Sequence, residues 1–446
     1  MGATTALNLH GDVPVQHMLA TIKREFMRVR ALSFRNCGVR SAGNEMGVLK
    51  GMHQLTYLDL GEHVLTNEDM WHVGQLADLR HLCISGPSSY LFSPDETEIK
   101  DDGLAYLGGL CALTFFDLSY CTVVSDAGLR QVRRWTNLRH LNFSNCPEIT
   151  DVGLEHLTEL GSLTHLDMST DDSLREIMCV QVTDGGLKHV GKLTALRHLS
   201  LAGCQLIYGH GLRLLKSCTG LEYLNLDELC CLEDGNMRHV GALTGLTTLS
   251  LNYCVHMSDA ELTHISGLTN LQSLHLGACV EITDRGLEIV TRLVSLKSLS
   301  LFRCINLSHE SLRYVAECVN LEYLDINALD CLEDEGLQRV CKLSALTSLN
   351  LFRSNCITDT GLQEISNLRR LQDLSLGHCG ITDGALSDLG NLEGLRKLHL
   401  AELPQITDGG LAHLTKLTAL KDLNVVRCAL ITADGEANLR NRLHFL

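Results

Sequence analysis

The segment Leu138-Arg139-His140-Leu141-Asn142-Phe143-Ser144-Asn145-Cys146 decides the fold, because its pattern returns along nearly the whole chain. Leu163-Thr164-His165-Leu166-Asp167-Met168 begins the same pattern 25 residues later. The full form, L-x-x-L-x-L-x-x-C or a close variant, starts at Val29, Leu55, Leu79, Leu113, Leu138, Leu163, Leu196, Leu221, Leu246, Leu271, Leu296, Leu321, Leu346, Leu371, Leu395 and Leu420. A partial copy stands at Leu7 and Leu9. About 17 units in register predict one solenoid over residues 1–446, with a partial first repeat over 1–28 and a C-terminal cap over 429–446.

Each unit divides into a strand half and a helix half. The L-x-L part alternates with period two, which is typical of a short strand with one buried face. The second half, as in residues 149–160, places Leu154, Leu157 and Leu160 on one helical stripe, and Thr150 before it is a good N-cap. No unit can bury its apolar face alone, so the units are expected to stack.

The composition and net charge of the chain limit the kinds of ligand that it is expected to bind. The 446 residues are 45% hydrophobic but only 4% aromatic, so leucine supplies the core. The net charge of −16 disfavours nucleic acid as the main ligand and disfavours anionic membranes, and it favours basic or neutral protein partners. Met1 to His10 has no signal-peptide pattern, and no apolar run approaches the ~18 residues of a membrane span.

Nine of the 19 cysteines occupy the single C column of the repeat: Cys37, Cys121, Cys146, Cys204, Cys254, Cys279, Cys304, Cys379 and Cys428. We interpret them as small buried residues that fill the turn after each strand. A zinc site would need two pairs that converge on one point, and a column along a solenoid does not supply them, so no metal or other cofactor is predicted. Unpaired core thiols favour a reducing compartment, the cytoplasm or, as an alternative, the nucleus.

The repeat L-x-x-L-x-L-x-x-C-x-x-[IV]-[TS]-D-x-G-L resembles the cysteine-containing class of leucine-rich repeats. That class occurs in F-box substrate receptors of ubiquitin ligases and in related proteins without an F-box. The resemblance implies an α/β solenoid shaped as a horseshoe, with a parallel concave sheet and convex helices. An F-box needs about 40 residues before the repeats, and only a few precede Leu7, so we expect any ligase-docking module to lie on another chain.

Two steps of the repeat are long, and the extra residues fall after the strand and before the helix cap. They occupy residues 85–100 and 169–181, which predicts two loops on the same edge of the solenoid. The first insertion carries the apolar triplet Tyr90-Leu91-Phe92 between two prolines. The triplet has two interpretations, an anchor for a partner or a segment that folds back on the helices.

A column of rings is predicted on the open face of the sheet. His140, His165 and His198 stand just before the second leucine of the strand, where side chains point out; His81 shares the column, with Phe115 between. Asp117, Asn142 and Asp167 form the next column. Such a patch has three interpretations: a metal or pH-sensing site, a solvated polar face, or part of a protein-binding surface.

Further candidates for partner binding lie along the same predicted face. Tyr223, Tyr323, Phe302 and Phe352 are expected to face the concavity, with Arg303 and Arg353 beside the phenylalanines. Aromatic residues and arginine are typical anchors of interfaces.

No catalytic set stands out from the repeat background, so the sequence predicts a non-enzymatic scaffold or adaptor that binds a protein within a multi-subunit complex. Two alternatives stay open. One is substrate recognition for a ubiquitin ligase. The other is a structural subunit of a large cytoskeletal or ribonucleoprotein assembly.

Overall fold

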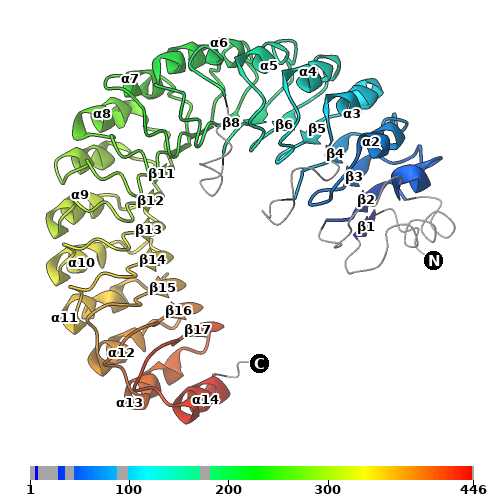
Figure 1. The fold of residues 1–446 in the computed structure, drawn as a ribbon. Helices are drawn as coiled ribbons and strands as arrows, with labels where there is room; N and C mark the ends of the chain where they lie inside the picture. Colours follow the sequence, from blue (N-terminus) through cyan, green and yellow to red (C-terminus); the bar gives the residue numbers. More distant parts are fainter. Residues whose placement is uncertain (1–5, 9–28, 36–44, 88–98, 171–180, 444–446) are drawn as a thin grey trace. The chain divides into compact units, whose positions relative to one another are not determined.

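A computed structural model of the chain describes residues 6–8, 29–35, 45–87, 99–170 and 181–443. The chain divides into two compact units, residues 1–233 and residues 234–446. In each unit, strands alternate with short helices along the chain, which confirms the predicted leucine-rich-repeat solenoid of parallel strands and stacked helices (Figure 1).

Within the described residues, the first unit holds nine parallel strands of three residues each: β1 Ala6–Asn8, β2 Ala31–Ser33, β3 Tyr57–Asp59, β4 His81–Cys83, β5 Phe115–Asp117, β6 His140–Asn142, β7 His165–Asp167, β8 His198–Ser200 and β9 Tyr223–Asn225. The helices are 3₁₀ helix η1 Glu45–Leu49, α2 Asn67–Val73, α3 Asp101–Tyr106, η2 Leu107–Gly109, α4 Asp126–Leu129, η3 Arg130–Arg134, α5 Asp151–Glu155, α6 Leu187–Val190 and η5 His210–Ser217.

The described part of the second unit has eight further parallel strands: β10 Thr248–Ser250, β11 Ser273–His275, β12 Ser298–Ser300, β13 Tyr323–Asp325, β14 Ser348–Asn350, β15 Asp373–Ser375, β16 Lys397–His399 and β17 Asp422–Asn424. Its helices are α7 Met237–Gly241, α8 Asp259–Thr263, η6 His264–Gly267, η7 Gly286–Arg292, η8 His309–Ser311, α9 Leu312–Val315, α10 Asp334–Val340, α11 Asp359–Leu362, η9 Ile365–Asn367, α12 Asp383–Leu389, α13 Asp408–Leu411, η10 Ala412–Lys416 and α14 Ala433–Arg442.

The core of each unit follows the leucine pattern. In β6, Leu141 is fully buried while the flanking His140 and Asn142 are partly exposed on the sheet face turned away from the helices, hereafter the open face. Leu154, Leu157 and Leu160 are all buried, as their spacing predicts, although α5 itself ends at Glu155. The helices are short because each 25-residue unit must return the chain to the next strand.

Neighbouring repeats are joined by a paired hydrogen bond that uses the Thr-Asp motif. The Asp126 carboxylate accepts from the backbone N–H of Thr150, one repeat later, at 2.8 Å and from its hydroxyl at 2.7 Å. Thr150 in turn caps α5, because its hydroxyl accepts from the backbone N–H of Val152. The same pair of bonds joins Asp101 to Ser125, Asp151 to Thr183, Asp259 to Thr283, Asp284 to Ser308, Asp334 to Thr358, Asp359 to Thr382, Asp383 to Thr407 and Asp408 to Thr432.

This link explains the glycine of the D-x-G-L motif. A Cβ built on Gly153 would lie 2.4 Å from the Oδ1 atom of Asp126, and one on Gly361 would lie 2.5 Å from that of Asp334. Glycine is therefore favoured at this position but not required, since Ser311 and Ala385 hold it in two repeats where Asp284 and Asp359 still bond to Ser308 and Thr382.

The cysteine column is structural where the structure describes it. The buried Cys304 thiol donates to the carbonyl of Leu276 in the preceding repeat at 3.1 Å, and Cys146 donates to Leu118 at 3.3 Å. Burial raises the pKa of both thiols to about 12, so they remain protonated and unreactive at neutral pH. Cys37 lies outside the described residues.

After most of the described strands, the third residue beyond the strand takes the left-handed backbone conformation, and only one of these residues, Gly203, is glycine. Tyr253 (φ 59°), Arg303 (φ 55°) and Arg353 (φ 60°) are examples. The backbone N–H of each donates to a carbonyl of the next repeat, as that of Arg303 does to Asn327 at 3.0 Å. These hydrogen bonds offset the strain of the conformation and carry the repeat-to-repeat pairing beyond the three-residue strands.

Candidate functional site

The open face of the first unit carries a stack of seven rings, one from the first residue of each strand from β3 to β9. Its members, which we term the ring ladder, are Tyr57, His81, Phe115, His140, His165, His198 and Tyr223. Successive ring centroids lie 4.1, 3.9, 4.3, 5.4, 5.3 and 3.8 Å apart.

Strand spacing and register produce the stack. Parallel strands lie about 4.8 Å apart, which is close to the separation of stacked aromatic rings. The pairing places His140 opposite His165 and His165 opposite His198, so each ring meets the next. Because the rings face one another, mainly their edges are left for a partner, including imidazole nitrogens and phenol hydroxyls.

Burial lowers the pKa of three imidazoles of the ring ladder, those of His81, His140 and His198. Burial lowers the pKa of His81 to about 4, partly opposed by the carboxylates of Asp59 and Asp117. Burial also lowers the pKa of His140 and of His198, and the neighbouring His165 lowers both further. At neutral pH these three rings are therefore uncharged.

A column of aspartates runs beside the ladder. Asp59, Asp117 and Asp167 end strands β3, β5 and β7, and each accepts the backbone N–H two residues further on at 2.9 to 3.0 Å. These bonds fix the turn after each strand, a structural role that the sequence did not reveal. The carboxylates also make the surroundings of the neutral rings acidic.

The ladder unites six of the predicted residues, His81, Phe115, His140, His165, His198 and Tyr223, with Asp117 and Asp167 in the adjacent column. Tyr57 is the member that the sequence pattern left unpredicted. Its signal was present, since it stands before the second leucine of its repeat, just as His81 does.

The predicted residues of the second unit do not join into one stack. Tyr323 begins β13 and is 36% exposed, but its neighbours in the column are Ser298 and Ser348. Phe302 and Phe352 lie beyond the strand ends. Phe302 packs over Gly277 and against Tyr253, with ring centroids 5.5 Å apart.

Phe352 packs over Gly377, and the guanidinium of Arg353 lies 5.5 Å from its ring centroid. Arg303 and Arg353 are exposed. Tyr90, Leu91 and Phe92 lie outside the described residues, as does most of both insertions.

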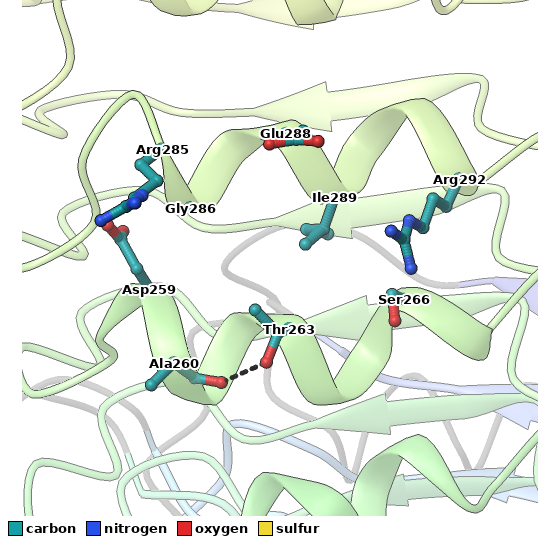
Figure 2. A pocket seen from close by; sticks show the side chains of 9 residues that line it. All are labelled: Asp259, Ala260, Thr263, Ser266, Arg285, Gly286, Glu288, Ile289 and Arg292. Atoms are coloured by element: carbon teal, nitrogen blue, oxygen red, sulfur yellow. Dashed lines mark hydrogen bonds between the residues drawn. The ribbon is translucent and has the colours of Figure 1, made fainter.

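A pocket of about 370 Å³ opens between the helices of two neighbouring repeats in the second unit. Figure 2 shows Arg285 directed toward Asp259 and Arg292 toward Ser266 across the gap. Asp259 already accepts from the Thr283 backbone at 2.8 Å and from its hydroxyl at 2.6 Å. The pocket therefore belongs to the contact between repeats, and the nine residues drawn include no pairing of a nucleophile with a base.

Metal chemistry finds no support in the part of the chain that the structure describes, where no group of three or more His, Cys, Asp or Glu side chains could hold an ion. Among the same residues, none of the helices combines the length and apolar character that a bilayer crossing requires.

Comparisons with known proteins agree with the repeat geometry. The Leucine Rich repeat family model matches residues 136–158, 267–288 and 343–366. No curated protein matches the sequence. Among solved structures, an internalin of Listeria monocytogenes has a TM-score of 0.51 at 21% identity, covering 73% of this chain and 82% of that one.

A leucine-rich-repeat protein of Leptospira interrogans has a TM-score of 0.53 at 19% identity, covering 97% of this chain and 98% of that one. TLR13 in its complex with ssRNA13 has a TM-score of 0.53 at 17% identity, covering 91% of this chain and 64% of that one. At these identities the likeness concerns the fold alone.

Proposed function

We propose that this leucine-rich-repeat chain is a non-catalytic adaptor, and that the ring ladder of its first unit binds a protein partner. The observation that carries the proposal is the continuity of the ladder: seven stacked rings from seven successive strands, on a face that the helices do not cover. Leucine-rich repeats typically serve as protein-binding scaffolds.

The chemistry of the ladder favours a basic or neutral polypeptide segment. Ring edges offer hydrogen-bonding nitrogens and hydroxyls, and Asp59, Asp117 and Asp167 place negative charge beside them. Arginine and lysine side chains of a partner would gain from both features.

Single-stranded nucleic acid suits the ladder poorly. Its bases bind by stacking on open aromatic faces, and here the faces of the inner rings are covered by neighbouring rings. The adjacent carboxylates would also repel phosphate.

We further propose that the chain belongs to the cysteine-containing class of leucine-rich repeats, with support from the column of thiols that donate to the preceding repeat. Recovery of cullin-type ligase components with the chain would support the substrate-receptor role, and recovery in a very large particle would support a structural subunit.

The test is affinity capture from native extract, with the captured partner identified by mass spectrometry, purified and titrated against variants. His140→Ala combined with His165→Ala is expected to weaken binding at least tenfold. The matched control, Ser273→Ala combined with Ser298→Ala, changes the same strand position in the second unit and should leave affinity unchanged.

Circular dichroism and thermal melting establish that each variant is folded. Equal affinity of the ladder variant and the control would contradict the proposal. Tyr90→Ala combined with Phe92→Ala tests separately whether the first insertion anchors the same partner.

A further inference from the structure

A groove of about 610 Å³ runs along one edge of the second unit, beyond the ends of β10 to β15. It is lined by the left-handed residues of successive repeats, Tyr253, Ala278, Arg303, Ala328, Arg353 and His378, which alternate between large and small as far as Arg353. The groove shares no residue with the ring ladder, so ligand binding in the groove is independent of the function proposed for the ladder.

The shape of the groove is set by side chains of different sizes. Ala278 and Ala328 form low points between the larger side chains, and an aliphatic strip of Val255, Val280 and Ile305 lines its side. Ile305 leaves 51% of its surface exposed. Such a strip offers apolar area to a ligand.

Aromatic contacts support both ends of the groove. Tyr253 packs edge-on against Phe302, which itself covers Gly277. Phe352 packs edge-on against His378, with ring centroids 5.4 Å apart, and covers Gly377. Tyr253 and His378, at the two ends of the groove, therefore rest on packed rings.

The two arginines of the groove have no charged partner in the part of the chain that the structure describes. Further along the same column, Glu402 pairs with His378 at 2.6 Å and with Arg427 at 3.1 Å, so neighbouring repeats are close enough to pair their charges. Arg303 instead lies between Ala278 and Ala328, and Arg353 lies between Ala328 and His378, whose imidazole pairs with Glu402. In a chain of net charge −16 they form an isolated positive feature.

The spacing of the arginines indicates the form of the ligand. They stand two repeats apart, about 10 Å at the usual strand separation. A polyproline II helix rises about 3.1 Å per residue with three residues per turn, so its equivalent side chains lie about 9.3 Å apart. Same-face residues of a β-strand lie nearer, at about 6.6 Å.

We propose that this groove binds an acidic peptide segment in a polyproline-II-like conformation, with carboxylates three residues apart on Arg303 and Arg353. Proline or aliphatic residues between the carboxylates contact the strip of Val255, Val280 and Ile305. The exposed Asp330, in the repeat between the two arginines, also lines the groove and repels negative charge placed between the two carboxylates of the peptide. It therefore favours uncharged residues at that point and disfavours the continuous phosphates of a nucleic acid.

The test titrates the full chain with a fluorescent peptide of three Glu-Pro-Leu units and follows anisotropy. Arg303→Gln combined with Arg353→Gln is expected to weaken binding about tenfold or more, since a charged hydrogen bond contributes at that scale. Arg427→Gln, an exposed arginine of the same column that lies outside the groove, is the matched control and should leave affinity unchanged.

Two further measurements separate shape from charge. Ala328→Leu fills a low point without changing charge and should also weaken binding, by about threefold or more. A Gln-Pro-Leu peptide and a peptide of the same composition with its three glutamates adjacent should both bind more weakly than the probe.

Binding of the probe that is insensitive to both the arginine pair and Ala328→Leu would overturn the proposal. It would also be overturned if oligouridylate competed in an arginine-dependent way at lower concentration than the peptide, because the groove would then be a nucleic-acid site. Neither result bears on the ring ladder, whose variants are tested against a different ligand.

Discussion

Burial and nearby charges have opposite effects on the pKa of His81 in the ring ladder. The pKa of His81 falls to about 4 because burial outweighs the nearby Asp59 and Asp117. The ring therefore stacks between Tyr57 and Phe115 as a neutral aromatic.

Acid should consequently destabilise the first unit. Because the pKa of His81 is lower in the folded chain than in the unfolded chain, the unfolded chain binds the proton first as pH falls. The stabilisation is complete above about pH 6.5 and is lost as pH approaches 4. After solvent screening is discounted, His81 alone should contribute a loss of about 1 to 2 kcal/mol.

Urea denaturation at pH 7 and pH 4.5 measures this loss. His81→Phe keeps a ring in the stack and removes the titrating group, so its free energy of unfolding should fall less over the same interval. Carboxylates elsewhere titrate equally in both proteins, and an identical fall in the two would contradict the assigned role of His81.

At the scale of the element, most of the linked repeats place a glycine beside the carboxylate of the preceding repeat. Gly153→Ala would place a methyl group 2.4 Å from the Asp126 Oδ1 atom, which accepts the Thr150 backbone N–H. The equivalent bonds persist beside Ser311 and Ala385 in other repeats, so we expect the Asp126 carboxylate to shift and the free energy of unfolding to fall by about 1 kcal/mol.

Gly161→Ala is the matched control in urea denaturation. A Cβ at Gly161 meets nothing within 4 Å, so its effect should stay within about 0.5 kcal/mol. If Gly153→Ala were as stable as this control, the steric account of the D-x-G-L motif would be wrong.

The strands and helix caps of each repeat could be predicted from the sequence, whereas the contacts between neighbouring repeats could not. The leucine spacing predicted the strand register, and Thr150 was recognised as a helix cap. That Asp126 would bond to Thr150 depends on how closely two repeats stack, which one repeat's sequence does not contain. The left-handed conformation of Arg303 was equally hidden, because residues other than glycine seldom adopt it.

The candidate site was foreseen in part for the same reason. A column position defines which strand residues share a face, so His81 to Tyr223 could be grouped by register. Phe302 and Phe352 lie beyond the strands, where register no longer fixes direction, and they pack over Gly277 and Gly377. The alternation that shapes the groove becomes visible only once the left-handed column is known.

For the whole molecule, the repeat architecture predicts that a destabilising substitution affects mainly its own repeat and the adjacent ones, since each repeat contacts mainly its neighbours. Gly361→Ala disturbs the link between Asp334 and Thr358. Hydrogen exchange should accelerate most in α10, α11 and the adjacent strands β14 and β15, with little change in β3 to β5.

Gly153→Ala should give the reverse pattern, with faster exchange around β6 and β7 and little change near β14. To measure both patterns, the intact chain undergoes hydrogen exchange and is then digested, and mass spectrometry gives the exchange of each peptide. Equal acceleration throughout the chain for either variant would indicate a single cooperative block in place of locally coupled repeats.

The aspartate link has a consequence for how such a chain lengthens. Many repeats present an acceptor to the following repeat and a donor to the preceding one, so a copied block of whole repeats inherits compatible ends. Nine of the 14 residues at 221–234 are identical at 321–334, which is four repeats later. A gene that gains or loses whole repeats would thus preserve the join, whereas one that gains a fraction of a repeat would leave a carboxylate facing the wrong residue.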